Sequence, residues 1–188
     1  GFRLARGGGQ EHFGVQADLA AYGKIIGGGM PVGMVAGTQD IMDRARSSRV
    51  FYGGTFSGNP LTVAAGLATL HQLTPMVYTY TSRIGDMLQA ELDDFTAEST
   101  APLHMMGCGS IRRMILSRTP ITSRRHRDSV EPPPDVQQRY YDQVRAGGVH
   151  IGANRILFLS AAHTAEDIRT IARVLCNSAR VLPGNQEE

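Results

Sequence analysis

The chain has 188 residues, of which 41% are hydrophobic and 19% charged, a balance typical of a globular protein and not of a disordered one. A formal net charge of +2 does not favour nucleic-acid binding, and no apolar run reaches the ~18 residues of a membrane-spanning helix. The two cysteines, Cys108 and Cys176, lie far apart and form no metal-ligand pattern. We therefore expect reduced thiols, no metal, and a cytoplasmic protein that binds neither nucleic acid nor membrane.

The first predicted elements surround Lys24, the only lysine of the chain. Residues 1–17 are glycine-rich and predict a loop with at most a short helical turn over residues 10–13. Residues 19–26 predict a short extended segment, and residues 32–36 a second strand. A partly desolvated lysine amine is a nucleophile that can form a Schiff base, and the glycines beside it leave room for a flat ring. A nucleotide phosphate loop is excluded, because its lysine follows the glycines and precedes a Ser or Thr. On these residues alone, a solvated turn is the more common structure for a lysine before a glycine run.

A second motif, FYGGTFSGNPLTVAA, covers residues 51–65. Before it, Thr38 predicts the N-cap of a short helix. Asn59 and Pro60 predict the start of another helix, so that Thr55 lies just before a helix N-terminus. Backbone amides and a threonine hydroxyl at such a place suit an anion such as phosphate. A simple turn with Thr55 as a local capping hydroxyl fits these residues equally well.

The segments YGKIIGGGMPVG, residues 22–33, and GGTFSGNPLTVAAGLATL, residues 53–70, together resemble class III aminotransferases, which are fold type I enzymes. The likeness is nearest to the glutamate-1-semialdehyde 2,1-aminomutase branch, strong up to residue 73 and looser to residue 174. It implies an α/β fold in two parts. Residues 1–73 would be the C-terminal part of the cofactor-binding large domain, and residues 74–188 a small α+β C-terminal domain.

The resemblance also implies a site. In the family, the lysine that matches Lys24 holds pyridoxal 5'-phosphate as an internal aldimine. The threonine that matches Thr55, helped by the backbone beside Gly54, binds the cofactor phosphate of the neighbouring subunit, which implies a homodimer with shared active sites. The segment that precedes a sequence like GFRLARGGG in the family carries an aspartate that pairs with the cofactor ring. We therefore expect this chain to be the C-terminal part of a longer enzyme, incomplete and inactive by itself.

The remaining elements predict a small α+β unit. They are a long helix over residues 75–95, a strand over 109–117, a polar loop over 118–134, a helix from 135, a strand over 156–160, and a last helix capped by Thr164. Neighbouring strand residues point to opposite faces, so one of Arg112 and Arg113 faces inward, towards a carboxylate or in a flanking salt bridge. The loop arginines from Arg124 to Arg127 stand beside acidic residues and indicate a solvated segment.

The segment SAAHTAED, residues 160–167, also resembles the family, with His163 in a structural role. Aminomutases of the family usually carry a serine–aromatic–glutamate stretch just before it, whereas this chain has Asn154 and Arg155. Arg155 is therefore our candidate for binding a substrate carboxylate, and a plain surface arginine is the alternative.

The predicted function is transfer of an amino group by a pyridoxal-phosphate-dependent transaminase acting through a lysine aldimine. Its substrate would be an amino acid, or a small amino-aldehyde or keto compound. Two alternatives remain: glutamate-1-semialdehyde 2,1-aminomutase, and a truncated non-catalytic fragment that dimerises or binds a partner. The sequence does not distinguish donors and acceptors.

Overall fold

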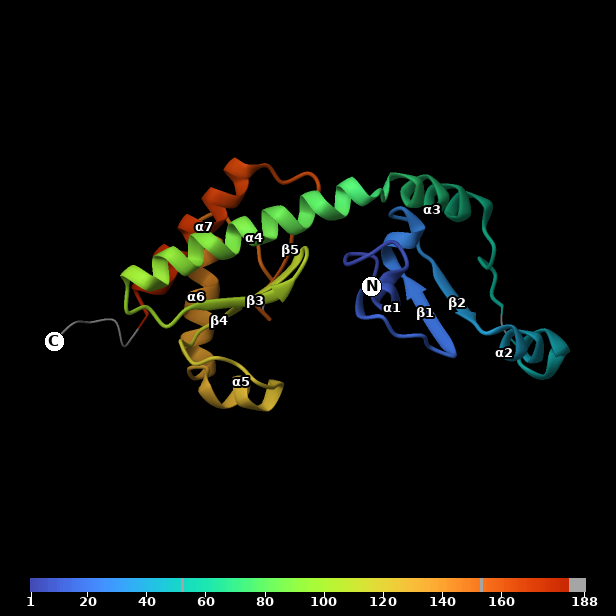
Figure 1. Cartoon of the computed structure of the whole chain (residues 1–188), viewed down its shortest axis with the longest axis horizontal. Coiled ribbons are helices and arrows are strands. Elements are labelled where there is room, and N and C mark those ends of the chain that lie inside the picture. Colours follow the sequence, from blue (N-terminus) through green and yellow to red (C-terminus); the bar gives the residue numbers. More distant parts are fainter. Residues whose placement is uncertain (52, 153, 183–188) are drawn as a thin grey trace. The chain divides into compact units, whose positions relative to one another are not determined.

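The computed structural model describes residues 1–51, 53–152 and 154–182 (Figure 1). The chain divides into two compact units, Gly1–Tyr78 and Thr79–Glu188, which we call the N-terminal and the C-terminal unit. Within the described residues, no helix combines the length and the hydrophobicity needed to cross a bilayer.

The N-terminal unit is built from short elements. They are α1 (Gly8–Phe13), β1 (Leu19–Gly23), the 3-10 helix η1 (Lys24–Gly27), β2 (Gly33–Gly37), α2 (Gln39–Arg44), the π-turn η2 (Ala45–Arg49) and α3 (Pro60–Gln72). Strands β1 and β2 form an antiparallel pair in which Gly23 lies opposite Gly33. The extended segment predicted up to residue 26 is thus too long, because the chain turns into η1 at Lys24.

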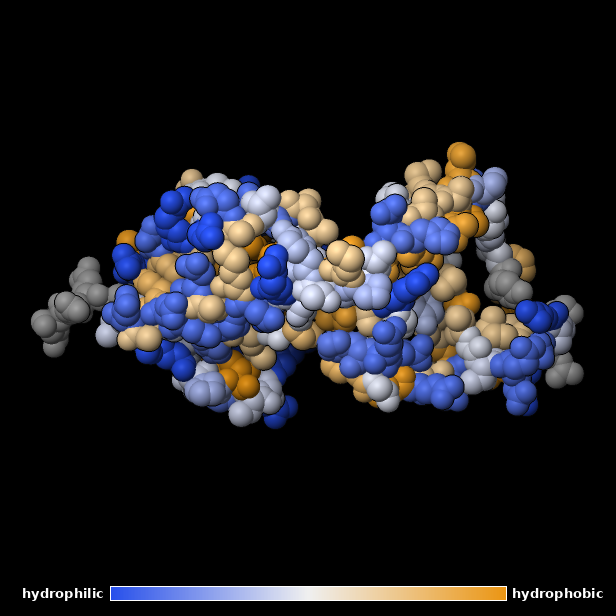
Figure 2. All heavy atoms as spheres, turned by 45° about the horizontal axis from the view of Figure 1, so that its top comes forward, coloured by the Kyte–Doolittle hydropathy of each residue, from blue (hydrophilic) through white to orange (hydrophobic). Residues whose placement is uncertain are grey.

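This unit has very little core of its own. Among its described residues, only Ile26 is a buried hydrophobic side chain. By contrast, Phe51, Phe56 and Met76 are 91%, 80% and 81% exposed. Hydrophobic residues accordingly appear at the surface of this unit in Figure 2. Single exposed apolar residues are ordinary, but so many on so small a unit indicate a surface made to be covered.

The C-terminal unit combines four helices with one sheet. Its elements are α4 (Pro75–Glu98), which begins in the N-terminal unit, β3 (His104–Cys108), β4 (Ile111–Ile115), α5 (Arg124–Val130), α6 (Pro134–Ala146), β5 (Ile156–Phe158) and α7 (Ala165–Arg180). The strands form an antiparallel sheet in the order β3-β4-β5.

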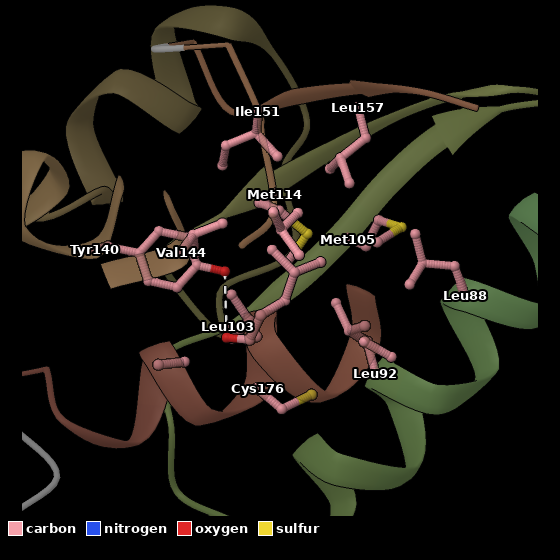
Figure 3. Close-up of a cluster of buried hydrophobic side chains, with 14 of the residues drawn as sticks. Leu88, Leu92, Leu103, Met105, Met114, Tyr140, Val144, Ile151, Leu157 and Cys176 are labelled. Carbon is pink, nitrogen blue, oxygen red and sulfur yellow. Dashed lines mark hydrogen bonds between the residues drawn. The ribbon is translucent and has the colours of Figure 1, made fainter. Parts of the chain in front are cut away.

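The core of this unit is formed by the apolar stripes of the helices and by the sheet (Figure 3). Leu88 and Leu92 of α4 lie four residues apart on one helix face, and both are fully buried. From α6 comes Tyr140, whose hydroxyl donates to the carbonyl oxygen of Leu175 at 3.3 Å. Burial raises the pKa of the Tyr140 hydroxyl, so this group stays a neutral donor.

The helix ends follow the sequence in most places. The side chain of Asn59 accepts from the backbone N–H groups of Leu61 and Thr62, and Thr164 forms a capping box with Asp167, as predicted. At Thr38 the predicted helix starts, but no capping hydrogen bond from the side chain forms. The predicted loop over 118–134 is wrong in part, because it contains α5, capped by Ser123.

Candidate functional site

Lys24 stands at the point where β1 ends and η1 begins. Its side chain is exposed, and its backbone is left-handed, with φ of 55°. Arg155, with φ of 58°, is the only other non-glycine residue with positive φ in the part of the chain that the structure describes. Such backbone is sparsely populated by side-chain-bearing residues and clusters at functional sites. Lys24 and Arg155, two of the predicted site residues, therefore share an unusual backbone conformation.

The segment after Lys24 is held tightly against α3. A Cβ at Gly66 of α3 would lie 2.1 Å from the carbonyl oxygen of Ile26, and one at Gly28 would lie 2.4 Å from that of Ala65. Gly28 also has φ of 58° and closes η1. Glycine alone permits this approach of two backbones, so the glycines fix η1, and with it the backbone of Lys24, on α3.

Replacing Gly66 with alanine is expected to destabilise the N-terminal unit by about 1–3 kcal/mol, because the added methyl group must push η1 away. Gly9→Ala is a matched control, since Gly9 is also helical and its Cβ would meet nothing within 4 Å. Thermal unfolding of both variants measures the difference. Equal melting temperatures would show that η1 and α3 are not in close contact.

Gly54 and Thr55 form an exposed turn before α3. The N–H of Ser57 donates to the carbonyl oxygen of Gly54 at 2.9 Å. Beside the turn lies a depression of about 600 Å³, lined by Pro31, Val32, Gly33, Gly54, Thr55, Phe56, Ser57, Gly58, Asn59, Thr62 and Val63. Lys24 does not line it.

The start of α3 offers fewer free donors to an anion than the sequence predicts. The N–H groups of Leu61 and Thr62 at the start of α3 are already bonded to the Asn59 side chain, at 3.0 and 3.2 Å. The helix end therefore has few donors left for an anion. What remains for one is the exposed turn itself, with the hydroxyl of Thr55 and the backbone around Gly54.

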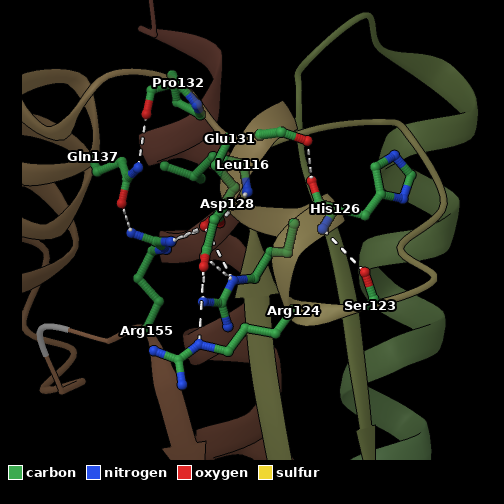
Figure 4. A network of polar contacts seen from close by, with 11 residues as sticks. Leu116, Ser123, Arg124, His126, Asp128, Glu131, Pro132, Gln137 and Arg155 are labelled. Atoms are coloured by element: carbon green, nitrogen blue, oxygen red, sulfur yellow. Dashed lines mark hydrogen bonds and ion pairs between the residues drawn. The ribbon is translucent and has the colours of Figure 1, made fainter.

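Arg155 lies inside the C-terminal unit, and its side chain is 4% exposed. One terminal nitrogen, Nη1, donates to Gln137 at 2.6 Å, and the other, Nη2, donates to both carboxylate oxygens of Glu131 at 2.6 Å (Figure 4). The alternative of a plain surface arginine is therefore wrong. The guanidinium already has a carboxylate partner, and a role in binding substrate stays a prediction.

The two neighbouring arginines of β4 differ as the strand geometry requires. Arg112 is buried and donates to Asp86 at 2.6 Å and to the carbonyl oxygen of Gly109 at 3.1 Å, the flanking salt bridge that was one of the two interpretations. Arg113, on the other face, has neither kind of partner among the described residues. His163 is structural, as predicted: its ring nitrogen Nδ1 accepts from the N–H of Ser160.

No metal centre is formed by the described residues, in which no three His, Cys, Asp or Glu side chains come together as ligands. Both cysteines are free thiols, and burial raises the pKa of Cys176 to about 11. No sequence pattern predicts the 600 Å³ depression or the contact between Glu131 and Arg155, because both depend on residues far apart in the chain.

Known proteins resemble this chain over nearly its whole length. A model of the family "Aminotransferase class-III" matches residues 3–166. Glutamate-1-semialdehyde 2,1-aminomutase from Methanobrevibacter smithii is 36% identical over 178 residues, which are 93% of this chain and 42% of that protein. Glutamate-1-semialdehyde 2,1-aminomutase 1 from Macrococcus caseolyticus is 37% identical, over 97% of this chain and 43% of that protein.

Among solved structures, an omega-transaminase from Sphaerobacter thermophilus superposes with a TM-score of 0.86 and 30% identity, over 95% of this chain and 42% of that one. A β-phenylalanine aminotransferase from Variovorax paradoxus gives 0.83 and 26%, over 93% and 41%. The chain thus spans about two fifths of the length of these relatives. These matches confirm the predicted α/β fold class and the prediction that the chain corresponds to only part of the family's enzymes. The chain belongs to the class-III aminotransferase family.

Proposed function

We propose that this chain is part of a pyridoxal-phosphate-dependent enzyme that transfers an amino group. The observation that carries the proposal is the placement of Lys24. The only lysine of the chain stands in a left-handed conformation at the end of a strand, on a segment that Gly28 and Gly66 hold against α3. The rigid support holds the amine in one place, as a covalent bond to an aldehyde requires.

In this proposal, residues 1–73 belong to the cofactor-binding large domain and residues 74–188 form the small C-terminal domain. When bound, pyridoxal phosphate supplies an electron sink for the carbanion at the substrate α-carbon. Lys24 would hold the cofactor through Nζ, and its amine would move the proton at that carbon. The turn at Gly54 and Thr55 holds the phosphate of a second subunit's cofactor.

The proposal includes a homodimer and the remainder of a longer protein. Lys24 is exposed in this chain and does not reach the depression beside Thr55, so one copy of the chain does not enclose a cofactor. The exposed side chains of Phe51 and Phe56 flank the Gly54–Thr55 turn in sequence. They offer apolar surface against which a second subunit, or the rest of a longer protein, can pack to enclose the cofactor. The free thiols Cys108 and Cys176 favour a cytoplasmic location.

Different observations support the two proposed activities, transaminase and aminomutase. The aminomutase is favoured by the names of the relatives at 36% and 37% identity. The transaminase is favoured by the omega-transaminase structure at 30% identity and by Arg155, which is buried and left-handed at the position where aminomutases usually differ. We propose Arg155 as the candidate for a substrate carboxylate. A non-catalytic fragment is the alternative that the exposure of Lys24 supports.

The test starts from the single lysine. The chain is incubated with pyridoxal phosphate, treated with borohydride, digested and analysed by mass spectrometry, with Lys24→Arg as the control. Besides Lys24, only the N-terminal amine can form an adduct, so the result is easily assigned. The same experiment on the longer protein is expected to place the adduct on Lys24 there as well. An unmodified Lys24 in the longer protein would refute the enzyme proposal.

A further inference from the structure

A group of charged residues lies around Arg113, on the face of β4 opposite to Met114 of the core. Arg113 of β4 points to the other side of the strand from Arg112 and Met114. It pairs in register with Ile156, the residue that follows Arg155. Arg127 of α5 also acts on Arg113, as do Glu131 and Asp128. We call Arg113, Arg127 and Arg155 the arginine cluster.

Both acidic residues near the arginine cluster are already engaged. Glu131 accepts from Arg155 at 2.6 Å with both oxygens, and lies 3.7 Å from Nε of Arg127. Asp128 accepts from Nε of Arg127 at 2.9 Å and lies 3.8 Å from Arg124. These carboxylates therefore compensate the charges of Arg127 and Arg155, and within the described residues neither forms a hydrogen bond or an ion pair with Arg113.

Arg113 is left without a partner in the part of the chain that the structure describes. Its side chain is half-buried, and its Nε is sealed from solvent without any hydrogen bond. Burial, and then the charges of Arg127 and Arg155, lower the pKa of Arg113. An arginine nevertheless stays protonated in proteins, so the charge persists and an unmade hydrogen bond in a half-buried place is costly.

We propose that Arg113 binds a carboxylate group that is supplied from outside the described chain. The two terminal nitrogens have no partner among the described residues and form the end of a planar fork, which matches the two oxygens of a carboxylate. Because Glu131 and Asp128 already compensate Arg155 and Arg127, the charge of Arg113 itself is the unpaired one that attracts an anion. The carboxylate comes either from a small molecule or from an acidic side chain of a longer protein that contains this chain. The proposal does not depend on the cofactor chemistry.

Calorimetric titration of the 188-residue chain with succinate tests the proposal, with sodium phosphate and chloride at matched ionic strength as comparison anions. Succinate is expected to bind, and Arg113→Gln to weaken the binding by about tenfold or more. Arg113→Lys keeps the charge but loses the fork and should fall between the two. Arg139→Gln is the matched control, because Arg139 is exposed and pairs with Asp135 at 3.2 Å away from this cluster.

The source of the carboxylate follows from repeating the titration on the longer protein. Binding that persists there, and that Arg113→Gln weakens, assigns the site to a free small molecule. Binding that is lost there assigns it to an acidic side chain that covers Arg113. Circular dichroism confirms that Arg113→Gln and Arg113→Lys are folded. Absence of succinate binding to the 188-residue chain, equal binding by Arg113→Gln, or phosphate and chloride binding as tightly as succinate would overturn the proposal.

Discussion

Replacing Glu131 with alanine is expected to destabilise the C-terminal unit by about 3–5 kcal/mol. The Glu131 side chain is 3% exposed and the Arg155 side chain 4%, so their ion pair is almost entirely removed from water. Glu131 also accepts from the backbone N–H of Leu116 at 3.3 Å. Its removal leaves a buried guanidinium with only Gln137 as partner, and burying an unpaired charge is the costly outcome. Urea denaturation followed by circular dichroism measures the change in the free energy of unfolding.

A double variant shows whether the cost comes from the unpaired charge. Glu131→Leu combined with Arg155→Met removes both charges and keeps most of the volume, and should be much closer to the original stability than Glu131→Ala. Asp135→Ala is the surface control. It removes the exposed Arg139 pair and should cost no more than about 1 kcal/mol. If the double variant is as unstable as the single one, the side chains contribute through packing and not through their charges.

The amphipathic helices could be predicted because their signals are local. Leu88 and Leu92 of α4 repeat at helical spacing, and Asn59 and Thr164 mark helix starts that the structure confirms. The short helix α5 could not be predicted in this way. It has seven residues and no buried one, so its own sequence has no apolar stripe. Its ion pairs, from Arg127 to Asp128 and Glu131, show up only in the folded chain.

The candidate site, too, could be predicted only where its sequence signals are local. Lys24 and Thr55 could be proposed because each stands in a continuous motif, and the structure adds the left-handed backbone and the close approach of Gly28 and Gly66. The burial of Arg155 could not be read from the sequence, since Glu131 lies 24 residues away and nothing local indicates the pair. The same limit applies to Arg113. It has no hydrogen-bond partner among the described residues because the neighbouring arginines already pair with the nearby carboxylates.

In the longer protein proposed above, Lys24→Arg is expected to lower kcat by on the order of 10²–10⁴-fold or more. Arginine keeps the positive charge, but its guanidinium does not lose a proton in proteins, so it can neither bond to an aldehyde nor accept the proton of the α-carbon. The kcat and KM of amino transfer from an amino-acid donor measure the effect.

Thr55→Ala should instead lower the affinity for the cofactor, and a high concentration of pyridoxal phosphate should restore much of the activity of this variant.

Two controls separate this chemistry from a loss of folding. Arg46→Gln removes an exposed positive charge of the same unit that pairs with Asp43 at 3.3 Å, and should leave turnover unchanged. Added methylamine can take over the proton transfer of a missing lysine amine, so it should partly rescue Lys24→Ala and leave the turnover of Arg46→Gln unchanged. Rescue cannot occur in a misfolded protein, which makes this the stricter criterion. Turnover by Lys24→Arg within tenfold of the original would mean that another amine does the work, and that the left-handed lysine on its glycine support serves a different purpose.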